Sequence, residues 1–363
     1  MTDPDSLYYL LAEGPRTISL TVPMAAKFRN VGISQPNAHP LTKSGVFIIC
    51  ELLQEYMTRC LTYPDDVLRA MEGIMRFYEQ RAAYTFLEGM PTGPFDAFSL
   101  FRSDGCALRR RRGYPSYSWA GWIGRISFSG LDMESDHVLD RWLNDSCPVS
   151  WHVIGDDEST PSTPIWKPGL WEKVCGRRRQ LLEKWIARLC NSTQAGASTV
   201  ADETPDQDTP LSAETADNSR QDTSPLPLVQ RSAIQHVQYK VLHFWAISVY
   251  LRIEPRNILT GTVWIVAENG EKVGVAWVDG TQDTALVDPS TALKFILISA
   301  APSLVRRELT AEEGRVLGNK TYNVLLLECS GPVSERRGVG LLSESGVRKS
   351  VSPGPRLGEI ILA

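Results

Sequence analysis

A series of strand-like segments fills the last third of this 363-residue chain and limits the folds open to it. The first, 239–253, alternates along its length, and Leu242, Phe244 and Ala246 add apolar residues to its second face. Its first half is therefore predicted to be buried on both sides. Further candidates lie at 261–267, 272–278, 293–299, 322–328, 338–342 and 358–362. The intervening Asn269-Gly270 and Asp279-Gly280 favour tight hairpin turns. The pattern predicts an antiparallel β-sandwich or barrel-like unit.

The first part of the chain has helical periodicity, which makes the predicted fold class α+β. A helix is expected at 45–59 and a second after Pro64 through Gln80, packed as a hairpin. A later helix should begin near Pro168 and end at Leu189, with one apolar face. Its opposite face is predicted to carry basic residues that face water: Lys173, Arg177, Arg178, Arg179, Lys184 and Arg188.

Charge is distributed unevenly. Residues 191–230 contain seven acids and one arginine, a net charge of -6, against -4 for the whole chain, so the remainder carries +2. That segment is rich in Ser, Thr and Pro and has few large apolar residues, so it is predicted to be a disordered acidic linker or insertion. The near-neutral remainder favours no nucleic-acid partner.

These boundaries divide the chain into five parts. We expect an irregular segment at 1–43, a helical region at 44–112, and a motif strand plus amphipathic helix at 113–190. The acidic segment follows at 191–230. The β-rich region at 231–363 is expected to pack with 113–155.

Cysteine usage and hydropathy indicate a cytoplasmic protein. The seven cysteines are an odd number without a CxxC pair, which favours reduced thiols. No apolar stretch approaches the roughly 20 residues of a membrane span. The basic helix at 170–189 leaves peripheral membrane contact open as an alternative to packing on the β-rich unit. His137, Cys147 and His152 match no zinc spacing, so neither a metal nor a cofactor is expected.

The densest aromatic stretch is Gly113–Gly124, GYPSYSWAGWIG, which we call the aromatic motif. It predicts a tight turn that feeds a strand of the β-rich unit. Core packing of Trp119 and Trp122 is favoured over a stacking platform for a ligand. The preceding run Arg109–Arg112 is expected to be partly solvated and partly paired with acids, rather than an anion site.

Two late features are interpreted in the same way. Arg336 and Arg337 are placed in a hairpin loop with Glu335, where a salt bridge is favoured over phosphate binding. His243 is expected to be a hydrogen-bonded histidine of the core rather than a catalytic base. No serine has the sequence context of a nucleophile, so no catalytic residue is assigned.

The aromatic motif resembles the PSWSWAGW signature that follows the heterokaryon incompatibility (HET) domain in a group of fungal proteins, with Tyr117 in place of a usual tryptophan. Four further stretches are similar to the family in the same order: LTYPDDVLRAMEGI (61–74), LHFWA (242–246), FILIS (295–299) and YNVLLLECSGPVSERRGVG (322–340). Together they cover roughly residues 56–342. The family-motif positions, given a structural role, are Pro115, Ser116, Ser118, Trp119, Ala120, Gly121, Trp122, Arg336, Arg337 and Gly338.

The HET domain itself, with its YAWG-like strand, has no counterpart in this sequence. Members of the family trigger cell death when genetically different hyphae fuse, and the HET domain is thought to be the effector. The resemblance thus implies a non-enzymatic recognition or regulatory region, with a protein partner of unknown identity. Two alternatives stay open: a small-ligand-binding module or enzyme with an unrecognised site, and a degenerate paralogue without activity.

Overall fold

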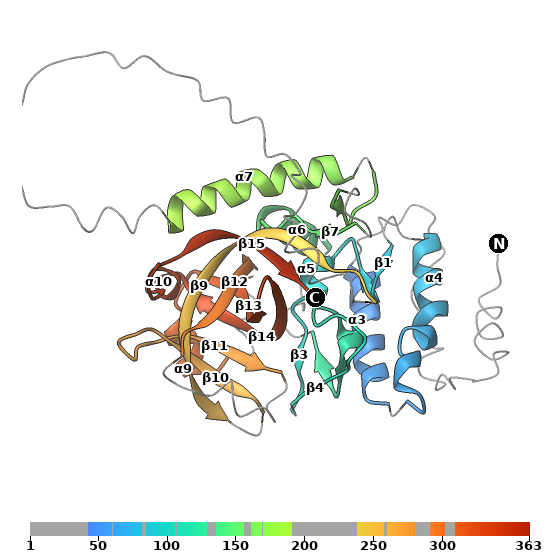
Figure 1. Ribbon diagram of the computed structural model, residues 1–363, viewed down its shortest axis with the longest axis horizontal. Coiled ribbons are helices and arrows are strands. Elements are labelled where there is room, and N and C mark those ends of the chain that lie inside the picture. Colours follow the sequence, from blue (N-terminus) through green and yellow to red (C-terminus); the bar gives the residue numbers. More distant parts are fainter. Residues whose placement is uncertain are drawn as a thin grey trace, which may run out of the picture.

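The structure is a computed structural model that packs a helical amino-terminal part against a large antiparallel sheet, which confirms the α+β class (Figure 1). It describes residues 43–59, 61–81, 85–105, 107–128, 136–155, 161–168, 170–190, 238–257, 260–279, 291–301 and 309–363. The acidic segment 191–230 and nearly all of the irregular segment 1–43 lie outside the described residues.

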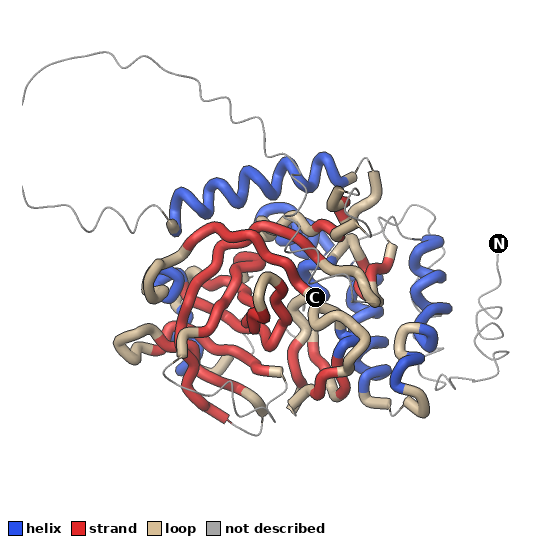
Figure 2. The backbone as a smooth tube through the Cα atoms, in the orientation of Figure 1, coloured by secondary structure: helices blue, strands red, loops and turns tan. Residues whose placement is uncertain are grey.

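Nine strands form this sheet within the described part of the chain. They are β7 (His152–Val153), β8 (Thr163–Pro164), β9 (Leu242–Asn257), β10 (Thr262–Val266), β11 (Lys272–Val278), β12 (Leu293–Ala300), β13 (Thr321–Ser330), β14 (Val333–Ser343) and β15 (Arg356–Leu362). The strands predicted after residue 238 are all confirmed. The order β10-β11-β14-β13-β12-β9 returns to β10 through a β9–β10 pairing, so six strands close into a barrel (Figure 2).

Apolar side chains that alternate along the strands fill the interior of the barrel. Ile247, Val249 and Leu251 of β9 join Phe295 and Val324 in one buried apolar cluster. Closure also requires neighbouring backbones to approach closely at glycines. A Cβ on Gly338 of β14 would lie 2.5 Å from the carbonyl oxygen of Trp277, so only glycine fits there.

The structure can be compared with two predicted turns and with the predicted burial of β9. Gly270 has φ of +79° and donates to the carbonyl of Ala267, which confirms the first turn. The second turn, Asp279-Gly280, reaches beyond the described residues at Gly280; the described strands show that β11 pairs with β10 and β14 and not with β12. The first half of β9 is not buried on both sides, because Trp245 is 46% exposed.

The amino-terminal part combines helices with short hairpins. Its helices are α3 (Lys43–Met57), α4 (Glu72–Arg81), α5 (Phe95–Phe98) and α6 (Asp136–Asp145), with 3-10 turns η1 (Pro64–Asp66), η2 (Arg69–Met71) and η3 (Trp119–Gly121). Its two-stranded sheets pair β1 (Phe86–Leu87) with β2 (Met90–Pro91), β3 (Arg102–Ser103) with β6 (Ile126–Ser127), and β4 (Arg109–Arg110) with β5 (Trp122–Ile123). The helix predicted at 45–59 is confirmed, whereas the second begins as two 3-10 turns and becomes α-helical at Glu72.

The described residues include three further helices: α7 (Trp171–Leu189), α9 (Ala311–Leu317) and α10 (Glu344–Arg348). In Figure 1, α7 runs along the upper side of the barrel, and α3 and α4 lie to its right. One apolar cluster extends from Leu53 of α3 through Trp119 to Phe244 and Leu325 on the outside of the barrel. The two parts therefore share a core. Among the described residues, no helix has the length and apolar character that crossing a membrane requires.

Candidate functional site

The aromatic motif forms a turn, then η3 and the short strand β5, but it does not enter the large sheet. β5 pairs with β4, with Trp122 opposite Arg110. The prediction that this strand joins the β-rich sheet is therefore wrong. The physical reason is the pairing of the motif strand with the residues just before it, Arg109 and Arg110, which take up its backbone. The motif instead meets the barrel through hydrogen bonds and packing.

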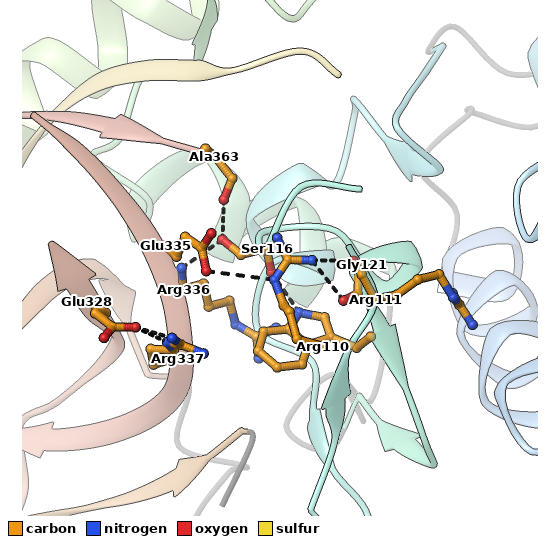
Figure 3. Close-up of polar contacts among 10 residues, drawn as sticks. Arg110, Arg111, Ser116, Gly121, Glu328, Glu335, Arg336, Arg337 and Ala363 are labelled. Atoms are coloured by element: carbon orange, nitrogen blue, oxygen red, sulfur yellow. Dashed lines mark hydrogen bonds and ion pairs between the residues drawn. The ribbon is translucent and has the colours of Figure 1, made fainter. Parts of the chain in front are cut away.

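Ser116 makes the central contact between the motif and the barrel (Figure 3). Its backbone N–H donates to the carbonyl oxygen of Ala363 at 3.0 Å, and its hydroxyl donates to the same oxygen. The hydroxyl also accepts from the backbone N–H of Arg336 at 2.7 Å. Ser116 is fully buried, so each contact is shielded from water. We call this contact of the motif with β14 and the end of β15 the junction.

Trp119 and Trp122 have no exposed surface. The Trp119 ring N–H donates to the carbonyl of Gly89 at 2.9 Å, and that of Trp122 to the carbonyl of Ser116 at 2.8 Å. Core packing is thus confirmed for both rings. The stacking-platform alternative fails, because neither ring has a free face.

The small residues of the motif allow this packing. A Cβ on Gly121 would lie 2.2 Å from the carbonyl oxygen of Pro115, so the two backbones are in contact. The Ser118 hydroxyl accepts from the N–H of Ala120 at 3.1 Å and donates to the carbonyl of Glu88 at 2.6 Å. Ser118 thereby caps η3 and ties it to the β1–β2 hairpin.

The arginine run divides as predicted between solvent and partners. Arg109 and Arg112 are exposed. Arg110 donates to the carbonyl of Gly121 at 2.9 Å and lies 3.8 Å from the Glu335 carboxylate. Arg111 is buried and donates to the carbonyl of Ala120 at 2.7 Å. Burial lowers the pKa of Arg110, while Glu335 opposes that shift.

Arg336 and Arg337 lie within β14, not in a hairpin loop, so their predicted placement is wrong. β14 and β13 are joined by a turn at Gly331, which has φ of +64°. Arg337 forms a salt bridge with Glu328, as Figure 3 shows. Sequence alone could not separate loop from strand here, because the charged run ERR lacks the apolar alternation typical of a half-buried strand.

Arg336 and Asp279 form an ion pair in which both side chains are fully buried, with Nη2 and Oδ2 3.1 Å apart. The guanidinium also lies 3.6 Å from the Phe101 ring centroid and donates to the Phe101 carbonyl. Burial raises the pKa of Asp279 to about 6, although Arg336 and then Arg337 act to lower it. The contact is an ion pair without a hydrogen bond, since neither oxygen of the carboxylate accepts one among the described residues. Asp279 is a residue that the sequence pointed to only as part of a turn.

A second buried pair joins α7 to α5. Arg178 and Asp96 lie 2.6 Å apart, with 4% and 0% of their side chains exposed. The ring N–H of Trp151 donates to the same carboxylate at 3.0 Å. The prediction that Arg178 faces water is wrong. The helical period could have predicted the burial of Arg178, because this residue lies four residues after Val174 and seven before Trp185, on the apolar face.

The histidines and cysteines do not assemble a metal centre within the described residues. His243 hydrogen-bonds Glu359, with 2.7 Å between Nε2 and Oε1, in a half-buried position. His152 lies opposite His243 across β7 and β9, and burial lowers its pKa. Cys147 is fully buried and remote from solvent.

Comparisons with protein-family models, with curated proteins and with solved structures find no match to this chain. The case for function therefore rests on the sequence motifs and on the geometry of the junction.

Proposed function

We propose that this chain is a non-enzymatic recognition or regulatory region of a HET-like protein, acting in non-self recognition and programmed cell death through a protein partner. The apolar cluster around the motif carries the proposal, because segments that resemble the family at distant sequence positions meet in it. Val67 from 61–74, Trp119 and Trp122 from the motif, Phe244 from 242–246 and Ile296 from 295–299 all belong to one apolar cluster. A resemblance scattered over 56–342 thus corresponds to one contiguous unit.

The bonding of the motif favours a structural role over a catalytic one. The Ser116 hydroxyl both donates and accepts inside the core, and the ring N–H groups of Trp119 and Trp122 are held by backbone carbonyls. A side chain with its polar atoms occupied in this way fixes a fold rather than meeting a substrate. A cytoplasmic location is part of the proposal, and the free thiols of Cys50, Cys147, Cys175, Cys190 and Cys329 are consistent with it.

Expression in a fungal host tests the proposal. We compare an empty vector, this chain alone, an intact HET domain alone and the HET domain fused to this chain, scoring growth and viability. The chain alone should leave growth unchanged, and the fusion should differ from the HET domain alone. Ser116→Ala in the fusion should shift growth toward that of the HET domain alone. Arg109→Gln, an exposed site beside the motif, should have no such effect.

Two results would overturn the proposal. Death caused by the chain alone would mean that it contains an effector of its own. Equal growth for the HET domain with and without this chain would mean that the chain regulates nothing, and would favour the degenerate paralogue.

A further inference from the structure

Four basic side chains form a line along the outside of α7. Lys173, Arg177, Lys184 and Arg188 follow one another at spacings of four, seven and four residues, which return to one face of an α-helix. All four side chains are exposed. At a rise of about 1.5 Å per residue the line is about 22 Å long. We call it the basic stripe.

The charges of the basic stripe are largely uncompensated by the described residues. The cations of α7 that have acidic partners there are Arg178, on the buried face, and Arg188, which lies 3.9 Å from Glu344. The apolar residues Trp185 and Leu189 of the same helix are buried against the barrel. The face of α7 that is exposed to solvent is therefore charged, and its apolar face is already covered. This arrangement disfavours insertion into a membrane surface and favours an acidic polypeptide as the binding partner.

Charge of the opposite sign occurs in the same chain just beyond the helix. Residues 202–222 contain seven acids and one arginine, a net charge of -6. Asp202 follows Cys190, which caps α7, by 12 residues. Twelve residues of extended chain reach about 40 Å, well beyond the length of the stripe. Attachment to the same chain also raises the effective concentration to roughly the millimolar range, so weak ion pairs suffice for occupancy.

We propose that the basic stripe of α7 binds the acidic sequence 202–222 of the same chain. The contact is electrostatic and weakens as salt is added, because each pair is exposed to solvent. It also competes with any other acidic polypeptide for this face of the helix.

Zero-length carbodiimide cross-linking of the full chain tests this pairing, because it joins an amine to a carboxylate only when the two are in contact. Mass spectrometry of the monomer fraction should find Lys173 or Lys184 linked to acids in 202–222. The ion pair of Lys272 with Glu312, 2.8 Å apart on the barrel, serves as an internal control for the reagent. Salt at about 0.5 M should abolish the first links, since the screening length falls to roughly 4 Å.

Charge variants of α7 provide a second test that keeps the reactive amines of Lys173 and Lys184. Arg177→Gln should lower the yield of the Lys173 and Lys184 links about threefold, since it removes the positive charge between them. Glu183→Gln, an exposed site on the adjacent face, should not lower it. Links that occur only in dimers would assign the stripe to a second copy and overturn the proposal. Absence of these links while Lys272 and Glu312 react would overturn it as well.

Discussion

Ser116 uses its backbone N–H and its hydroxyl to hold two strands that are distant from it in sequence. Replacing Ser116 by Ala leaves the N–H of Arg336 buried without its acceptor and removes one donor from the Ala363 carbonyl. We expect the free energy of unfolding to fall by about 1–3 kcal/mol, the usual cost of an unsatisfied buried group. Urea denaturation measures it. Ser330→Ala, at an exposed position of β13, should change it by less than about 0.5 kcal/mol.

Asp279 should give the fold a distinctive pH dependence. Its pKa is about 6 in the folded protein, against 3.8 ordinarily, so between these values the folded state keeps a proton that the unfolded state releases. The group thus stabilises the fold as pH falls from 7 toward 4, by up to about 3 kcal/mol. The free energy of unfolding of the natural protein minus that of Asp279→Asn should therefore rise as the pH is lowered from 7 toward 4. A constant difference would contradict the shifted pKa.

At the scale of elements, α7 is anchored by one charged residue within its apolar face. Arg178→Met leaves Asp96 buried without its cation, which should lower the free energy of unfolding by about 3–5 kcal/mol. Adding Asp96→Leu should restore much of the loss, because neither of the two positions then carries a buried charge. Arg179→Met, one residue further along and exposed, should change stability by less than about 0.5 kcal/mol. Equal effects of Arg178→Met and Arg179→Met in chemical denaturation would mean that the pair does not anchor the helix.

The elements that the sequence predicts best are those with a strict period. The alternation from Ile247 to Ile253 and the turn at Asn269-Gly270 indicated the barrel strands, and the helical period indicated α3 and α7. What escaped prediction depends on partners from elsewhere in the chain. Asp279 becomes a buried anion because β14 brings Arg336 beside it, and the local Asp-Gly sequence does not predict this contact. The motif strand stays outside the sheet because it pairs with Arg109 and Arg110 of β4 instead.

At the scale of the whole molecule, the helical part and the barrel share an apolar cluster, so they should unfold together. Tryptophan fluorescence, to which Trp119, Trp122 and Trp151 contribute from that cluster, and far-ultraviolet circular dichroism should give coincident denaturation curves. Arg336→Met should shift both curves by the same amount. Separate midpoints for the two signals would mean that the parts are independent domains.

The junction also sets an order of events during synthesis. Ser116 bonds to residues 220 and 247 positions later in the chain, so its contacts cannot form when the motif leaves the ribosome. At about 5–20 residues per second, translation takes roughly 10 to 50 seconds to reach them. Throughout that interval the motif lacks its bonds to Arg336 and Ala363, so its docking on the barrel is a late step of folding. A nascent chain that waits this long for its last strands is a natural client for chaperones, and the arginines beside the motif would keep it soluble meanwhile.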